Sequence, residues 1–259
     1  MKEISQKKEL RLSLLWIAVY VVVFTICKNI SEMGEFAYLI KALVSIILVC
    51  AIWRYIRKND AQEYYGFTKI NPVLRKNLWM LIPFIILASI NLWNGVHIRM
   101  TALEIAMSIV SMLCIGFIEE AIFRGFLFKA MLRENIKTAV IISSITFGLG
   151  HIVNLLNGAE FLPTILQIIY AAAIGFMFAM FVLKMNYIYP CIACHGLVNA
   201  LSIFNSGGHT IFYQIVVCII IVILAGGFGI YLSRIEFKKA PWQFCWGACF
   251  DFMLKRFIF

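Results

Sequence analysis

Charged residues are scarce in this chain, and aspartate is almost missing. Of 259 residues, 14% are charged and 63% are hydrophobic, and the only aspartates are Asp60 and Asp251. A soluble domain is usually about 25% charged and about 45–50% apolar. The composition therefore excludes an ordinary soluble domain. It predicts an all-α fold, a polytopic bundle of about eight transmembrane helices.

Several hydrolase signatures are also missing. There is no HExxH for a zinc-binding helix and no GxSxG-like elbow for a nucleophilic serine. Neither aspartate falls in an apolar run, which excludes a catalytic pair of intramembrane aspartates. The net charge of +10 is spread over short loops, so it predicts contact with anionic lipid rather than with nucleic acid.

The eight cysteines do not predict a disulfide framework, because most of them lie inside apolar runs, where free cysteine packs as a small hydrophobe. Cys191, Cys194 and His195 match the CxxCH pattern of c-type haem attachment. This pattern opens an apolar run on the predicted cytoplasmic side, which is the wrong side for haem attachment. Packing is the favoured interpretation, with haem or a Cys/Cys/His metal site as weaker alternatives.

Eight apolar segments approach the length of about 20 residues that a membrane helix needs. They are residues 12–31, 36–53, 77–94, 101–131, 138–156, 162–184, 187–205 and 210–233. Lys and Arg gather at the N-terminus, in alternate connections and after the last segment, which predicts that both termini are cytoplasmic. We expect one multi-pass membrane domain over 1–259, a catalytic core at about 101–205, and an interfacial tail on the inner leaflet at 234–259.

Three ionisable residues occur together in the fourth apolar segment, in the run GFIEEAIFRGFLF. Glu119, Glu120 and Arg124 would each cost about 2.5–3.5 kcal/mol to insert near the bilayer centre, which favours a functional site. Glu120 and Arg124 are four residues apart, so they share a helix face and can form an ion pair. Such a pair could also have only a structural role, holding packed helices together. Glu119 has no partner in the sequence, which favours a chemical role.

Further polar residues lie in two other segments at compatible depths. Phe147 and His151 are four residues apart in the fifth segment, and His195 and Asn199 are four apart in the seventh. A histidine in a membrane helix can simply bridge two helices by a hydrogen bond. Together with a spare carboxylate, however, imidazoles and an amide can stabilise a developing oxyanion. The combination predicts a site that activates water against a carbonyl group.

These residues also carry a family resemblance. The runs GFIEEAIFRGFLF, FGLGH and HGLVN match the motifs EExxxR, FxxxH and HxxxN, in that order and on three segments. They resemble the CAAX-protease and bacteriocin-processing (CPBP) family of intramembrane endopeptidases, over about residues 101–205. Some of its members act in bacteriocin maturation and self-immunity.

The resemblance implies roles for the matched residues. Glu119 would be the general base with His151 orienting the water, and His195 and Asn199 would hold the oxyanion. Glu120 and Arg124 would brace the helix, with Phe147 as further structural support. The family is often called a metalloprotease, although a metal-free glutamate mechanism is also argued for it. If zinc binds, the candidate ligands are Glu119, His151 and His195.

We therefore predict an intramembrane endopeptidase with a site facing the cytoplasm and a membrane-associated peptide or protein as substrate. The alternative is a non-catalytic membrane scaffold or bacteriocin-immunity protein that binds a peptide or an enzyme partner.

Overall fold

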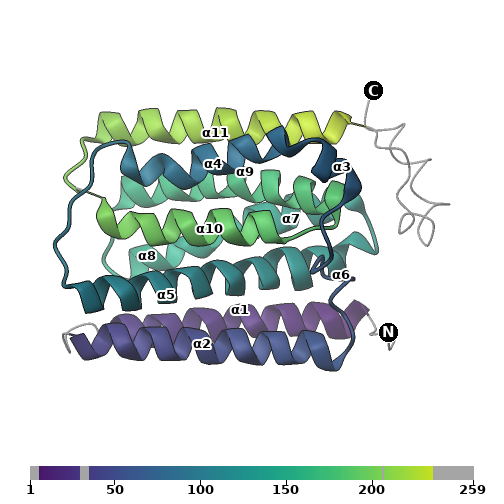
Figure 1. The fold of residues 1–259 in the computed structure, drawn as a ribbon, viewed down its shortest axis with the longest axis horizontal. Helices are drawn as coiled ribbons and strands as arrows, with labels where there is room; N and C mark the ends of the chain where they lie inside the picture. Colours follow the sequence, from purple (N-terminus) through teal and green to yellow (C-terminus); the bar gives the residue numbers. More distant parts are fainter. Residues whose placement is uncertain (1–5, 30–34, 206, 236–259) are drawn as a thin grey trace.

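The structure, a computed structural model, describes residues 6–29, 35–205 and 207–235. This part of the chain is helical and contains no strand, as the composition predicted (Figure 1). The α-helices are α1 (Gln6–Asn29), α2 (Glu35–Lys58), α3 (Pro72–Lys76), α4 (Ile82–Ser89), α5 (Ala102–Glu120), α6 (Phe128–Leu132), α7 (Ile136–Leu149), α8 (Val153–Leu156), α9 (Phe161–Met185), α10 (Tyr189–Leu201) and α11 (Ile211–Arg234). Short 3-10 turns are η2 (Leu78–Leu81), η3 (Ile90–Leu92), η5 (Gly150–Ile152) and η6 (Ser202–Phe204), and Ala121–Leu127 (η4) is a π-helix.

All eight predicted membrane segments are helical. Six helical stretches of the described chain are long and apolar enough to cross a membrane: Gln6–Cys27, Phe36–Lys58, Ala102–Leu132, Ile136–Leu156, Phe161–Met185 and Ile211–Arg234. The third and seventh predicted segments correspond to two shorter apolar stretches, Leu78–Leu92 and Tyr189–Phe204. The chain is therefore an integral membrane protein built as a helical bundle. The predicted interfacial tail falls almost entirely on residues 236–259, outside the described residues.

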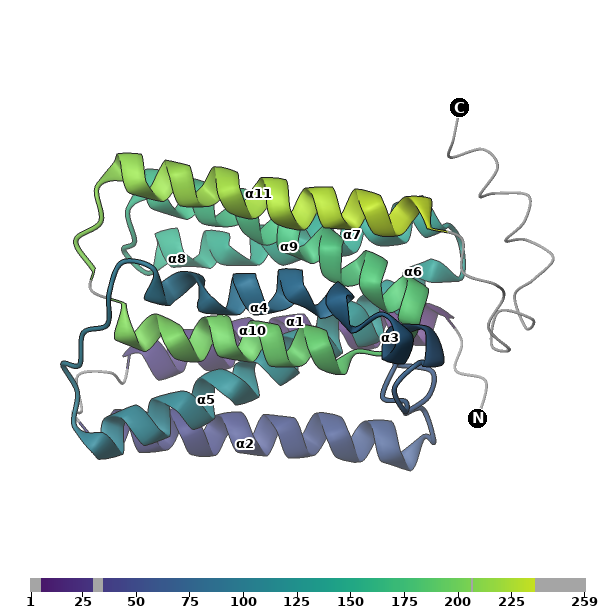
Figure 2. The ribbon, with the colours of Figure 1, turned by 45° about the horizontal axis from the view of Figure 1, so that its top comes forward.

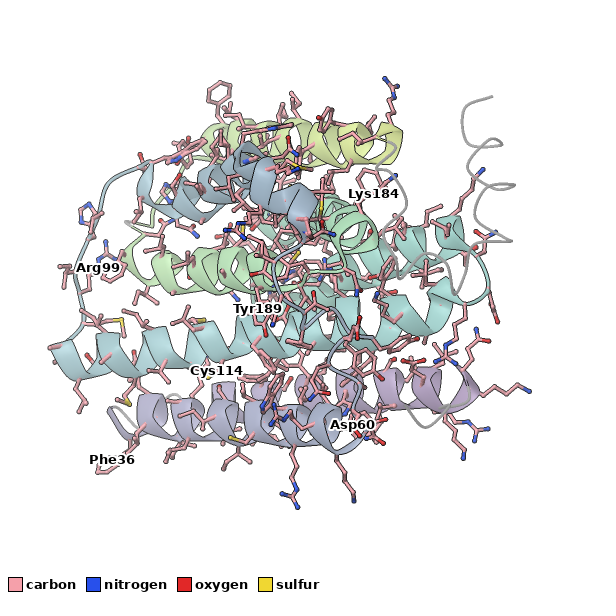
Figure 3. All side chains as sticks on the ribbon, turned by 45° about the vertical axis from the view of Figure 1, so that its right-hand side comes forward. Phe36, Asp60, Arg99, Cys114, Lys184 and Tyr189 are labelled. Carbon is pink, nitrogen blue, oxygen red and sulfur yellow. The ribbon has the colours of Figure 1, made fainter. Side chains whose placement is uncertain are left out.

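The helices run roughly along one axis, with the N- and C-terminal ends at the same end of the bundle (Figure 1). α11 lies over α9, and α10 lies between α4 and α5 (Figure 2). The outside of the bundle is apolar, as contact with lipid tails requires. Phe36 on α2 is 70% exposed and lies at the rim of the bundle (Figure 3).

The connection between α2 and α4 contains the run EYYGF, residues 63–67, and packs into the bundle although many of its residues are polar. Tyr65 of the EYYGF run is fully buried, and its ring packs edge-on against Phe126 with centroids 5.0 Å apart. Gly66, at φ 84°, accepts a backbone hydrogen bond of 3.0 Å from Ile188. Two tyrosines and a phenylalanine in a short polar stretch were the sequence signal for this burial. The segment therefore closes the end of the bundle at which both termini lie.

A buried ionic cluster ties α1 to this same end. Glu9 has no exposed surface, and its carboxylate lies 3.2 Å from the guanidinium of Arg133. The Tyr64 hydroxyl donates to the same carboxylate at 3.2 Å. Lys129 lies in α6 and donates to Oδ1 of Asn186 at 2.7 Å. Burial of Lys129 becomes tolerable because this amide oxygen, with Glu9 nearby, supplies its partners.

Candidate active site

The two adjacent glutamates lie where α5 changes its helical geometry. α5 begins with a capping box between Thr101 and Glu104 and runs as an α-helix to Glu120. The next seven residues form the π-helix Ala121–Leu127. Such wider turns are rare and occur frequently at functional sites. The change of geometry begins directly after Glu120, so the two carboxylates and Arg124 lie on either side of the junction.

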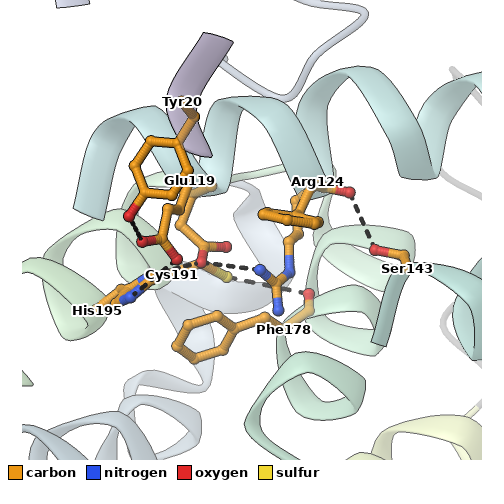
Figure 4. A network of polar contacts seen from close by, with 9 residues as sticks. Tyr20, Glu119, Arg124, Ser143, Phe178, Cys191 and His195 are labelled. Atoms are coloured by element: carbon orange, nitrogen blue, oxygen red, sulfur yellow. Dashed lines mark hydrogen bonds and ion pairs between the residues drawn. The ribbon is translucent and has the colours of Figure 1, made fainter. Parts of the chain in front are cut away.

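Glu120 is held in place by Arg124 and His195. Its Oε1 accepts a hydrogen bond of 3.0 Å from Nη1 of Arg124, and the pair has no exposed surface. The same oxygen lies 2.8 Å from Nδ1 of His195 on α10 (Figure 4). The predicted Glu120–Arg124 pair is therefore formed, and it also anchors the histidine of another helix.

Glu119 has a different environment. The Tyr20 hydroxyl of α1 donates a hydrogen bond to Oε1 of Glu119 (Figure 4). Its other oxygen, Oε2, lies 3.6 Å from Nε2 of His195, and the residue keeps 7% of its surface exposed. The imidazole of His195 thus lies between the two carboxylates. One carboxylate is locked in an ion pair, and the other borders a cavity.

Glycines bring α5 and α10 close enough for these contacts. A Cβ added to Gly116 would lie only 2.5 Å from the backbone nitrogen of Gly196. Gly116 is one helical turn before Glu119 and Glu120, and Gly196 directly follows His195. Small residues at helix crossings let membrane helices approach through their backbones. This approach sets the distance between the glutamates and the histidine.

Aromatic rings enclose the guanidinium of Arg124. Its Cζ lies 4.1 Å from the ring centroid of Phe147 and 5.3 Å from that of Phe178. Cation–π contacts of this kind stabilise a desolvated charge. Gly175 leaves room for the group, because a Cβ there would lie 3.1 Å from Nη2 of Arg124. Phe147, predicted as structural support, therefore packs against the charge that braces Glu120.

His151 lies near the carboxylates without bonding to them directly. It sits in the 3-10 turn η5, is half-buried, and lines the same cavity as Glu119. Its ring meets Phe147 edge-on at 5.9 Å, and His195 meets the same phenylalanine at 5.4 Å. Phe147 thus contacts both imidazole rings. Asn199 lies one turn beyond His195 on α10 and is half-buried, and its side chain forms no hydrogen bond with the described residues.

A cavity of about 650 Å³ begins at Glu119, within the size range of small-ligand pockets. Its walls come from the later halves of α1 and α7, the first half of α2, and α5 and α8. Apart from α5, which runs along the bundle, these parts lie at the end of the bundle opposite the termini (Figure 1). The cavity therefore runs away from the end predicted to be cytoplasmic, so the predicted cytoplasmic termini and the predicted cytoplasm-facing site do not hold together. The reason is that the EYYGF segment and the Glu9 cluster close the terminal end.

The zinc candidates do not converge as a ligand set. Within the described ranges, no three His, Cys, Asp or Glu side chains are placed to hold a metal ion. His195 directs Nδ1 to Glu120, and Glu119 accepts the Tyr20 hydroxyl, so both are engaged with protein groups. The thiols of Cys191 and Cys194 instead point to the backbone carbonyls of Phe178 and Phe84. These cysteines pack inside the bundle, as their apolar context indicated.

Sequence reasoning missed one member of the site. Tyr20 belongs to the first apolar segment, whose sequence resembles any membrane helix, and it is 99 positions from its partner Glu119. A hydroxyl-bearing aromatic in the middle of an apolar run was the only signal. No spacing rule connects residues on separate helices, so the contact could come only from the packed structure.

Comparison with known families agrees with this geometry. A family model described as type II CAAX prenyl endopeptidase, Rce1-like, matches residues 101–201. The searches of curated proteins and of solved structures found no match. The matched segment contains all three motifs, from Glu119 to Asn199. Residues 101–201 are therefore similar to the Rce1-like type II CAAX prenyl endopeptidases, in agreement with the predicted CPBP resemblance.

Proposed function

We propose that the protein is an intramembrane endopeptidase that cleaves membrane-associated peptides or proteins with water activated by Glu119. The observation that supports this most strongly is the contrast between the two neighbouring carboxylates. Glu120 is fully buried and paired with Arg124, whereas Glu119 borders the cavity. Two adjacent carboxylates in divergent environments are typical of one structural and one reactive group. The family match adds that related domains are endopeptidases.

In the proposed reaction, Glu119 removes a proton from a water molecule in the cavity while the water oxygen attacks the scissile carbonyl carbon. The carbonyl oxygen becomes an oxyanion in the tetrahedral intermediate. When the C–N bond breaks, Glu119 returns the proton to the leaving nitrogen, so that an acid and an amine are released. The Tyr20 hydrogen bond orients the carboxylate. His151, on the same cavity wall, helps to position the water.

His195 and Asn199 are the proposed donors to the oxyanion. A doubly protonated His195 would donate Nδ1–H to Glu120 and keep Nε2–H for the oxyanion. Its charge would balance the two carboxylates together with Arg124, which matters in a medium where unpaired charge is costly. Asn199 lies one turn further along the same face of α10. The mechanism uses these side chains alone, because the candidate zinc ligands do not converge.

The membrane placement is also part of the proposal. Both termini lie in the cytoplasm, anionic lipid binds at the basic cytoplasmic loops and tail, and residues 1–259 act as one membrane domain. With this orientation the cavity opens from Glu119 toward the non-cytoplasmic half of the bundle. Cytoplasmic substrates would have to enter laterally, from the lipid phase.

Peptide profiling of membranes tests the catalytic proposal. Membranes containing the wild-type protein, Glu119→Gln and Glu104→Gln would be compared by mass spectrometry. Glu104→Gln is a matched control, because it makes the same change on the same helix and keeps a capping-box residue. A positioned base typically raises the reaction rate by about 10²–10⁴-fold, so the cleavage products should be lost only with Glu119→Gln. If that variant keeps full biological activity, the scaffold or immunity interpretation replaces catalysis.

A further inference from the structure

α1 is joined to the rest of the bundle by polar contacts at two levels. Near its start, the Glu9 carboxylate lies 3.2 Å from the guanidinium of Arg133 and accepts a hydrogen bond of 3.2 Å from the Tyr64 hydroxyl. Eleven residues later, the Tyr20 hydroxyl donates to Glu119. The proposed reaction uses the second contact and gives the first no role. A fully buried carboxylate on a membrane helix nevertheless needs a reason, because removing its charge from water costs free energy.

α1 buries little of its apolar surface against the bundle. Among the side chains described over residues 6–27, Glu9, Ser13 and Cys27 are buried, and the others are half-buried or exposed. In a bilayer, an apolar side chain gains little by leaving lipid tails for another helix, so hydrophobic burial does not drive membrane helices together. Polar contacts therefore contribute much of what fixes the position of α1.

The two contacts match in spacing. α1 packs against η4 and α6 and runs in the opposite direction to α5 (Figure 1). Along α1, Tyr20 lies about 17 Å from Glu9 at about 1.5 Å per residue. The fourteen residues from Glu119 to Arg133 span about 21 Å at the same rise, and the wider turns of the π-helix η4 shorten that span. The Glu9–Arg133 pair therefore sets the level at which Tyr20 meets Glu119.

We propose that Glu9 is a positioning residue for the proposed base. Through its contacts with Arg133 and Tyr64 it fixes α1 along the helix axis, and so holds the Tyr20 hydroxyl on Glu119. Glu9 is not part of the cavity wall, so its effect is transmitted through the helix between it and Tyr20. The inference rests on the proposed function for its effect on turnover, whereas the placement of Tyr20 can be measured without a substrate.

Fluorine NMR on the full chain in detergent reports the Tyr20 hydrogen bond directly. The protein is labelled with 3-fluorotyrosine, and the Tyr20 resonance is assigned as the one that Tyr20→Phe removes. Glu119→Gln gives the position of this resonance when the accepting carboxylate is lost. Glu9→Leu removes the carboxylate of α1 without stranding a buried charge, because the Arg133 side chain is 20% exposed and still donates to the Tyr64 oxygen.

In Glu9→Leu, the Tyr20 resonance should move toward its position in Glu119→Gln. The resonance of Tyr213 on α11 should stay in place, which shows that the fold is intact. Arg11→Leu is the matched control and should move neither resonance, because Arg11 is an exposed charged residue of the same helix. Glu9→Gln keeps a hydrogen-bond acceptor and should give a smaller shift, and it carries the comparison if Glu9→Leu does not fold. An unmoved Tyr20 resonance in both Glu9 variants overturns the inference.

Turnover in a double variant separates positioning from a general loss of stability. Glu9→Leu alone should lower the rate of product formation in membranes by about three- to tenfold, less than the loss expected for Tyr20→Phe. Added to Tyr20→Phe, it should lower the rate by no more than about twofold further, because the hydrogen bond is already gone. Losses that multiply would overturn the inference. If the resonance moves as expected but wild-type membranes yield no cleavage products, the protease proposal fails and the positioning of Tyr20 by Glu9 stands.

Discussion

Replacing Gly116 with alanine should move the glutamates of α5 away from His195 of α10 without altering any polar side chain. The added Cβ would lie 2.5 Å from the Gly196 nitrogen, whereas ordinary contacts begin at 3.4 Å, so α5 and α10 must separate by about 0.9 Å. If the side chains did not follow, the 2.8 Å contact between His195 and Glu120 would become about 3.7 Å, beyond hydrogen-bonding distance. Overpacking of this kind lowers the free energy of unfolding by about 1–3 kcal/mol.

Activity should respond more strongly than stability. A displacement of about 1 Å in a catalytic arrangement can cost about 10²-fold in rate. Gly116→Ala should therefore lower the formation of cleavage products by about that factor. Unfolding can be followed with a thiol-reactive dye, because Cys191 and Cys194 are buried and react only when the bundle opens. The melting temperature should fall measurably while the folded protein can still be purified.

Gly226→Ala is the matched control for this experiment. It makes the same substitution in another membrane helix, α11, where an added Cβ would meet nothing within 4 Å. Both substitutions gain the same intrinsic helix propensity, so the comparison isolates the clash. Wild-type activity and melting temperature in Gly116→Ala would refute the view that backbone contact between α5 and α10 sets the geometry of the site.

Three further substitutions and a topology measurement test other parts of the reasoning. Arg124→Ala leaves Glu120 buried without its main partner, which should lower the free energy of unfolding by about 3–5 kcal/mol and reduce the yield of folded protein. Unchanged expression and an unchanged melting temperature would show that the pair is not structural. Tyr20→Phe removes a hydrogen bond to a carboxylate, which typically contributes about 1.5–3 kcal/mol to stability, so the melting temperature should fall and turnover should fall at least tenfold. Unaltered turnover would remove Tyr20 from the site. Asn199→Ala should reduce turnover by about 10²–10³-fold if it is an oxyanion donor, and an effect on substrate binding alone would contradict that role. Reporters fused at the C-terminus and at Ala159 should report cytoplasm and the opposite side respectively, and the same side for both would refute the eight-segment topology.

The sequence by itself determined the class of fold and most of the residues of the candidate site. Apolar runs of membrane length can satisfy their backbone groups only as helices in lipid, so an all-α bundle followed from composition. The Glu120–Arg124 pair followed from spacing, because residues four apart on a helix are neighbours whatever surrounds them. The order of the three motifs was sufficient to predict the resemblance to the CPBP family, with which the family match over residues 101–201 agrees.

Only the tertiary structure decided how these residues meet across helices. The approach of His195 to both glutamates depends on the separation of α5 and α10, which the contact between Gly116 and Gly196 sets. The Tyr20 hydrogen bond and the burial of the EYYGF segment likewise depend on helix packing. The direction of the cavity, away from the termini, follows from that burial. Contacts between helices carry no periodic signal in the sequence, because they depend on how side-chain volumes pack in three dimensions.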